Sequence, residues 1–183
     1  MKNHFSFVGS DKGSWRVTSN RTLRGDGLAP VQRIEVINSP AAEVIEGGSW
    51  VLQGFTSNIR YAIRDELTRL KAVQEGLNRP AARSAALIPI RKNAEWWAMT
   101  QEERRAVFEE KSHHTAIGLK FLPAIARQLH HARDLGEPFD FLTWFEFAPE
   151  HTALFDQLLA QLRATREWQY VDREVDIRLA RDA

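Results

Sequence analysis

The sequence predicts an α+β fold built from ferredoxin-like units, and three observations carry this prediction. From Ala86 onward, strand and helix patterns follow one another in the order β-α-β-β-α-β. A truncated series of strands and one helix precedes them in residues 1–80, and no low-complexity linker separates this part from residues 81–183. An antiparallel sheet with helices on one face needs a cover on its other face. We therefore expect a second sheet, from the same chain or from a partner, to complete a sandwich or barrel in an oligomeric protein.

The N-terminal part, residues 1–80, contains three strand patterns and one helix pattern. Residues 5–8, 31–37 and 50–55 are the predicted strands. Gly47 and Gly48 are expected to turn the chain between the last two strands, which would then form an antiparallel hairpin. Asn58 is a candidate N-cap for a helix that ends before Pro80. The apolar stripe of this helix would consist of Ile63, Leu67, Leu70 and Leu77.

The C-terminal part, residues 81–183, begins with a short apolar strand at residues 86–91. Pro89 within it predicts an edge strand or a bulge, because proline cannot donate to the sheet ladder. Thr100 and Glu103 form a capping box, which opens a helix that extends to the His113-His114 doublet. Pro123 ends that helical tendency and predicts an extended chain after it.

Two more strands, a helix and a final strand follow. Residues 124–131 and 139–147 are predicted strands joined by a turn at 134–138, and the second is apolar at both parities, so both of its faces should be covered. Pro149 introduces a helix with an apolar side made of Phe155, Leu158, Leu159 and Leu162. In the last strand we expect Val175, Ile177 and Leu179 to face the core and Glu174, Asp176 and Arg178 to face solvent.

Composition excludes several classes of function. The chain has 183 residues, of which 43% are hydrophobic, so a core of ordinary size is available. The formal charge of +1 indicates neither a nucleic-acid partner nor a membrane partner. The absence of cysteine excludes disulfides, thiolate nucleophiles, zinc–thiolate sites and iron–sulfur clusters. No segment is apolar enough for a signal peptide or a membrane span, so we expect a cytoplasmic protein.

His114 and Arg127 are the most informative pair of residues. Arg127 shares strand parity with Ile125 and Leu129, so all three side chains should point to one face. A guanidinium on an apolar face is costly unless a counter-charge, a cofactor or an anionic substrate meets it. The pair therefore favours a metal centre with something negative beside it. The alternative for Arg127 is a structural ion pair, for example with Glu146 on the neighbouring strand.

The histidines themselves leave alternatives open. His113 and His114 cannot both face inward, because adjacent helical residues point about 100° apart. Both could instead cap the C-terminus of their helix, where the dipole favours a cation. No H-x-x-x-H or H-E-x-x-H spacing exists, which disfavours a zinc hydrolase, and a single axial histidine suits a haem better than a bare metal ion. His130 and His131, near the end of their strand, are expected in solvent.

Lys92, Trp96 and Trp97 stand at a strand-to-helix junction. The two tryptophans could anchor the core or an interface. They could equally wall a flat aromatic cofactor, with Lys92 reaching a carboxylate such as a propionate. Glu167 precedes the last strand and has no helical or strand role in the pattern, so a solvated loop carboxylate is its ordinary interpretation.

Taken together, these residues resemble the chlorite dismutase family. The resemblance covers the chain from about Trp50 to its end. It rests on the runs Trp50…Gly54…Ser57-Asn58…Arg60-Tyr61, Lys92…Glu95-Trp96-Trp97, His113-His114…Arg127 and Phe139…Phe147. It implies a dimeric α+β barrel of ferredoxin-like units with haem b in the C-terminal unit. The length resembles the short, N-terminally trimmed branch, whose members are typically homodimers.

The resemblance also implies roles for individual residues. His114 would be the proximal haem ligand, and Glu167 would accept a hydrogen bond from its other ring nitrogen. Arg127 would be the distal arginine, with Gln74 as a distal neighbour and Ile88 in the distal wall. The residues expected to line the haem and its proximal side are Lys92, Trp96 and Trp97.

The implied activity is that of a haem b-dependent chlorite O2-lyase, an oxidoreductase that converts chlorite to chloride and dioxygen. The expected route passes through ferryl haem and a transient hypochlorite held by Arg127, which recombine to form the O–O bond. The sister coproheme decarboxylases look to have a tyrosine in place of Ile88 and no arginine in place of Arg127, so decarboxylation is the first alternative. A non-catalytic haem-binding or haem-sensing dimer is the second.

Overall fold

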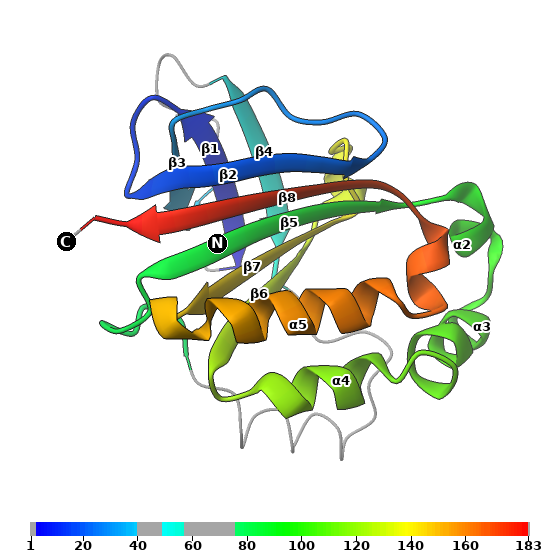
Figure 1. Ribbon diagram of the computed structural model, residues 1–183. Helices are drawn as coiled ribbons and strands as arrows, with labels where there is room; N and C mark the ends of the chain where they lie inside the picture. The colour runs from blue at the N-terminus through cyan, green and yellow to red at the C-terminus, as the bar shows by residue number, and fades with distance from the viewer. Residues whose placement is uncertain (1–2, 40–48, 57–75, 183) are drawn as a thin grey trace.

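The structure, a computed structural model, describes residues 3–39, 49–56 and 76–182 (Figure 1). Strands of the described ranges close into one barrel in the order β1-β3-β2-β8-β5-β7-β6-β4, and each pair is antiparallel. The strands are β1 (His4–Ser10), β2 (Trp15–Arg24), β3 (Arg33–Ile37), β4 (Trp50–Phe55), β5 (Ser84–Lys92), β6 (Ile125–His131), β7 (Phe141–Phe147) and β8 (Val171–Arg181).

The C-terminal half has the predicted β-α-β-β-α-β order, and its strands lie side by side as β8-β5-β7-β6. Helices α4 (His114–Phe121) and α5 (Thr152–Arg163) lie along the outer side of this sheet, while α2 (Ala94–Ala98) and α3 (Gln101–Arg105) lie at one end of it (Figure 1). The predicted α+β fold and barrel are therefore confirmed. The inner face of the sheet, which the helices do not cover, lines the barrel interior. The N-terminal strands close the barrel.

The N-terminal half differs from the prediction in two ways. Strand β1 lies between β3 and β4, so the hairpin expected across Gly47 and Gly48 is wrong. The long strand β2, which the sequence patterns did not indicate, pairs with β8 and joins the two halves. The helix expected from Asn58 lies outside the described residues except at its end, where Leu77 lies in a bend and packs against the barrel interior.

Two apolar cores lie on either side of the C-terminal sheet. Side chains such as Phe7 and Leu87 fill the barrel interior, and side chains such as Ile88 and Phe145 pack beneath the helices. Because successive residues of a strand point to opposite faces, one strand contributes to both cores. This explains why β7 is apolar at both parities, as predicted. β5 is a central strand, because it pairs with both β7 and β8, so the expected edge position of Pro89 is wrong.

The outward face of β8 was also wrongly assigned. Glu174 and Asp176 are only 1% and 0% exposed, because α5 lies across that face of the sheet. Arg163 of α5 reaches both carboxylates, at 2.7 Å from Glu174 and 2.9 Å from Asp176. The predicted apolar side of α5, with Phe155, Leu158, Leu159 and Leu162, is buried as expected.

The helix expected from Thr100 to His114 is broken into parts. Thr100 and Glu103 form the predicted capping box of α3. A π-helical turn at Ala106–Glu110 follows, and a new helix then begins at His114. This interruption decides where His114 points.

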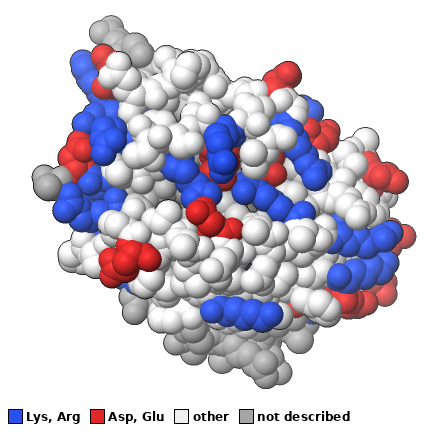
Figure 2. Space-filling model, viewed as in Figure 1, with Lys and Arg blue, Asp and Glu red and all other residues white. Residues whose placement is uncertain are grey.

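The surface and the helices agree with the composition. On the face viewed in Figure 2, Lys and Arg side chains are interspersed with Asp and Glu, in keeping with the formal charge of +1. No helix of the described ranges is both long and apolar enough to cross a membrane. The division at residue 80 stays a prediction, because strands from both sides of it close a single barrel.

Candidate functional site

His114 is the first residue of α4, so its expected place near the end of a helix is wrong. The chain enters this helix through His113, whose backbone adopts the left-handed conformation with φ 52°. The Glu109 carboxylate accepts a hydrogen bond from the Thr115 N–H at 3.0 Å and so caps the helix start. His113 is exposed, whereas His114 lines an internal cavity. This turn separates the two neighbouring histidines.

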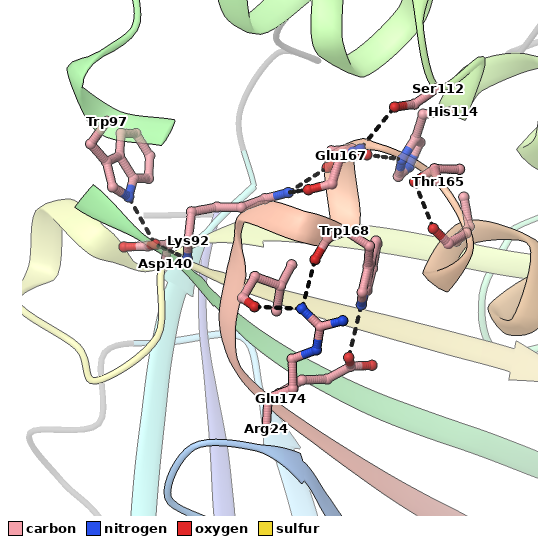
Figure 3. A network of polar contacts seen from close by, with 12 residues as sticks. Arg24, Lys92, Trp97, Ser112, His114, Asp140, Thr165, Glu167, Trp168 and Glu174 are labelled. Carbon is pink, nitrogen blue, oxygen red and sulfur yellow. Dashed lines mark hydrogen bonds and ion pairs between the residues drawn. The ribbon is translucent and has the colours of Figure 1, made fainter. Parts of the chain in front are cut away.

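Glu167 and Lys92 form a buried ion pair beside His114 (Figure 3). Glu167 Oε2 lies 2.7 Å from His114 Nδ1, and its Oε1 lies 2.7 Å from Lys92 Nζ. The expectation of a solvated loop carboxylate is wrong, because Glu167 opens a 3-10 turn and is only 4% exposed. The carboxylate that Lys92 reaches in this structure is therefore one of the chain's own.

The charge of Glu167 fixes Nδ1 of His114 as a hydrogen-bond donor. Burial alone would raise the pKa of Glu167, but the Lys92 ammonium and the His114 ring together lower that pKa to about 2. The ionised carboxylate can only accept, so Nδ1 of His114 donates to it. In the neutral imidazole the lone pair then lies on the other ring nitrogen, Nε2. Among the described residues Nε2 has no hydrogen-bond partner.

Two further contacts hold this pair in position. The Ser112 hydroxyl accepts a hydrogen bond from the Glu167 N–H at 2.9 Å (Figure 3). The Phe108 ring, from the π-helical turn, stacks on the His114 ring with centroids 4.3 Å apart and planes 22° apart. The imidazole is therefore fixed in both rotation and tilt before any ligand arrives.

The cavity beside His114 lies between the C-terminal sheet and the helices. It has two lobes, whose walls share His114, Arg127, Phe145 and Leu162. Most other lining side chains are apolar, among them Ile88, which was expected in this wall. Walls of this character suit a mainly apolar molecule with a few polar contacts.

Arg127 enters the cavity from β6. As predicted, Ile125 and Leu129 point to the same side, since both line the cavity with it. Burial lowers the pKa of Arg127, and the attraction of Glu167 offsets part of that effect. The ion pair considered with Glu146 does not form, because Glu146 faces the barrel interior. There it accepts hydrogen bonds from Trp144 Nε1 and from the Asn78 N–H.

The two tryptophans take different positions. Trp96 is buried in the cavity wall, with Lys92 Nζ 4.4 Å from its ring centroid. Trp97 is not among the residues that line this cavity, in contrast to the expectation. Its Nε1 donates to Asp140 Oδ2 at 3.0 Å, and the guanidinium of Arg133 lies 3.7 Å from its ring centroid. Trp97 thus supports the wall from outside.

Some residues of the site were missed or misplaced by the sequence analysis. His130 was expected in solvent but is 1% exposed in the barrel interior, and His131 lies partly buried in the cavity wall. Strand parity could have indicated His131, since it shares parity with Leu129 and Arg127. Nothing in the local pattern pointed to Ser112 or Phe108. Gln74, the expected distal neighbour, lies outside the described residues.

The arrangement suits a single axial ligand rather than a metal cage. In the described ranges, no group of three or more His, Asp or Glu side chains could hold a metal ion by itself. One imidazole, whose Nε2 has no partner among the described residues, therefore faces a mainly apolar cavity, which the partly buried guanidinium of Arg127 also borders. This combination can hold a metal through a bulky organic group and can attract an anion beside it.

Comparisons with known proteins relate this chain to one family. The profile of the family described as Chlorite dismutase matches residues 42–182. A crystal structure of dimeric chlorite dismutases from Nitrobacter winogradskyi superimposes with a TM-score of 0.91 and 54% identity, over 97% of this chain and 99% of that one.

More distant relatives match at lower identity. A chlorite dismutase of Ideonella dechloratans is 33% identical over 121 residues, which is 65% of this chain and 40% of that protein, so this chain spans less than half of its length. A chlorite dismutase from Candidatus Nitrospira defluvii, solved in complex with imidazole, is 21% identical with a TM-score of 0.70, over 100% of this chain and 93% of that one, and shares the fold.

Proposed function

The chain belongs to the chlorite dismutase family, and on that premise we propose that it is a haem b-dependent chlorite O2-lyase, which converts chlorite to chloride and dioxygen. The observation that carries the proposal is the presence of two groups on one cavity. His114 offers a free Nε2 to a metal, and Arg127 offers a desolvated positive charge to an anion.

The residues of the site are suited to haem. The largely apolar cavity matches a porphyrin, and a single histidine is sufficient as an axial protein ligand. The hydrogen bond from Nδ1 to Glu167 leaves Nε2 as the only ring nitrogen that can bind iron. Haem, when bound, supplies the redox chemistry by which chlorite is decomposed.

Glu167 tunes the proposed ligand. Because its ionised carboxylate accepts the Nδ1 proton, it gives His114 part of the character of an imidazolate and makes it a stronger electron donor. Lys92 neutralises the second oxygen and keeps the carboxylate from turning away. The protein therefore sets both the orientation and the basicity of the ligand before the cofactor binds.

Arg127 is proposed to hold the chlorine-containing anion during the reaction. Within a cavity of mostly apolar side chains, the attraction between a guanidinium and a small anion is much stronger than in water. The same apolar walls, Ile88 and Leu129 among them, limit the water that could carry a reactive chlorine species away. Confinement of this kind would keep the species beside Arg127 until the reaction is complete.

The alternative of coproheme decarboxylation receives less support. Ile88 lines the cavity where the decarboxylases look to have a tyrosine, and no tyrosine is among the described residues of its wall. We also propose that the protein is a homodimer, because the Nitrobacter relative is described as dimeric. Chlorite is the proposed small-molecule partner.

An oxygen electrode tests the proposal. Purified protein loaded with haem b should release dioxygen when chlorite is added, and His114→Ala should bind little haem and release none. Full haem occupancy without dioxygen would contradict the proposal and would favour a haem-binding or haem-sensing role. Conversion of added coproheme and peroxide to haem b would instead support the decarboxylase.

A further inference from the structure

Gly118 has no evident structural reason to be glycine. It lies in α4, four residues after His114, so the two residues lie on the same face of the helix. Its φ does not fall in the left-handed region that favours glycine, and a Cβ added there would meet no atom of the described residues within 4 Å. A glycine in a helix is less stable than an alanine, because its unfolded chain is more flexible.

The space beside Gly118 belongs to the smaller lobe of the cavity. That lobe lies between α4, α5 and the strands β6 and β7. Its polar lining residues are His114, Thr115 and Arg127, and the rest of its wall is made of Phe121, Leu122, Ile125, Phe145, Leu158 and Leu162, beside Gly118 itself. A wall of this composition suits an apolar edge of a flat molecule and offers no lysine to a carboxylate.

We propose that Gly118 is a positioning residue for the cofactor. Its bare backbone lets the apolar edge of the planar macrocycle lie against α4, at the level where His114 Nε2 reaches the metal. A side chain at this position would stand in the lobe on the same helix face as His114. It would therefore push the ring away from the imidazole. This inference rests on the proposed binding of haem. It explains the stability lost by having glycine in the helix through cofactor binding rather than through the fold.

The test uses a series of side chains at one position with a matched control. Gly118→Ala and Gly118→Leu add increasing bulk to the lobe, and Ala116→Leu adds bulk to an exposed position of the same helix. Ferric haem b is titrated into each haem-free protein and followed at the Soret band. Thermal unfolding of each haem-free protein is measured separately, so that folding and cofactor binding are not confused.

Opposite changes in the two measurements are expected. Gly118→Ala should raise the melting temperature of the haem-free protein by about 2–4 °C and should weaken haem binding about tenfold. Gly118→Leu should weaken binding at least a hundredfold, whereas Ala116→Leu should leave it unchanged. The resonance Raman band of the iron–imidazole bond should shift in haem-saturated Gly118→Ala, a change that a purely structural role would not produce.

Three results would overturn the inference. Unchanged haem affinity in a folded Gly118→Leu variant would overturn it and leave the proposed function standing. If Gly118→Leu does not fold, Gly118→Ala decides, and unchanged affinity there would have the same meaning. Failure of the wild-type protein to bind haem, with a folded haem-free state, would overturn the proposed function and this inference with it.

Discussion

Nδ1 of His114 lies 2.7 Å from Oε2 of Glu167, and the other oxygen of the same carboxylate lies 2.7 Å from Nζ of Lys92. The three residues come from α4, from the turn before β8 and from β5. One buried carboxylate thus orients an imidazole and neutralises an ammonium at the same time. The position of the proposed iron ligand depends on elements that are far apart in the sequence.

Replacement of Glu167 by glutamine should separate the electronic role of this carboxylate from its shape. We expect Glu167→Gln to bind haem, because the amide can still contact the ring. The midpoint potential of the iron should rise, because the imidazole loses electron-donating character, and activity should fall about 10–100-fold. Spectroelectrochemistry measures the potential, and a wild-type value would contradict the proposed tuning.

The same variant should be less stable, since it leaves the Lys92 ammonium buried without its counter-charge. The expected loss in the free energy of unfolding is about 3–5 kcal/mol. Adding Lys92→Met to Glu167→Gln removes the stranded charge. Denaturation of the double variant should show recovered stability while the potential stays raised, and recovery of both would mean that Lys92 rather than Glu167 sets the potential.

The two adjacent histidines should respond in opposite ways to substitution. His113→Gly should raise the free energy of unfolding by up to about 1 kcal/mol, because glycine adopts the left-handed conformation without a Cβ clash. Its haem affinity should equal that of the wild type. His114→Ala should lose haem, and urea denaturation with Soret titration measures both effects. Loss of haem in His113→Gly, with haem retained in His114→Ala, would show that His113 is the ligand.

Arg127→Ala should keep haem but lose control of the chlorine species. Without the guanidinium, attraction for the anion falls, so kcat/KM for chlorite should drop at least tenfold and hypochlorite should escape more often. A chlorination trap added to the reaction measures that escape. Arg127→Lys keeps the charge but not the bidentate geometry, so its hypochlorite escape should lie between that of Arg127→Ala and that of the wild type. Equal trapping with Arg127→Ala and the wild type would remove Arg127 from the proposed role.

His130 should make stability depend on pH. Burial lowers its pKa from 6.5 to about 4, so the folded protein keeps the ring neutral while the unfolded chain protonates it more readily. Between pH 6.5 and 4 the unfolded chain binds more protons, so the free energy of unfolding should fall as the pH falls. The loss should amount to about 3 kcal/mol.

His130→Asn should flatten that dependence. The asparagine amide can still donate to the Leu142 carbonyl, which Nδ1 of His130 contacts at 3.0 Å, but it does not titrate. Urea denaturation at pH 7 and pH 4.5 should therefore differ less in His130→Asn than in the wild type. The exposed His113, replaced by Asn, serves as the control and should keep the wild-type difference. If the free energy of unfolding of His130→Asn differs between the two pH values as much as that of the wild type, other groups cause the acid sensitivity.

The fold could be predicted to the extent that apolar patterns reveal it. The β-α-β-β-α-β order follows from strongly apolar segments such as β7 and α5. Strand β2 escaped detection because most of its residues are exposed or half-buried, and backbone pairing with β8 holds it in place. Glu174 and Asp176 alternate with apolar residues as solvent-facing residues would. Only the position of α5 shows that they are buried.

The site was predictable residue by residue only where strand parity or the family resemblance applied. Strand parity correctly predicted that Ile125, Arg127 and Leu129 lie on one face. It could not show that the helix breaks before His114, because the break depends on a π-helical turn and a left-handed residue rather than on a proline or glycine. Nor could it show that Glu167 is buried, since its partners Lys92 and His114 lie at least 50 residues away in sequence.

Isotopic labelling of chlorite tests the central claim most directly. Haem-loaded protein is given chlorite that carries 18O at both oxygen atoms, in ordinary water, and the dioxygen is analysed by mass spectrometry. If one site holds both fragments until they recombine, the dioxygen carries two labelled atoms and its amount equals the chlorite consumed. Dioxygen with one atom from water, or chlorite consumed without dioxygen, would contradict the account.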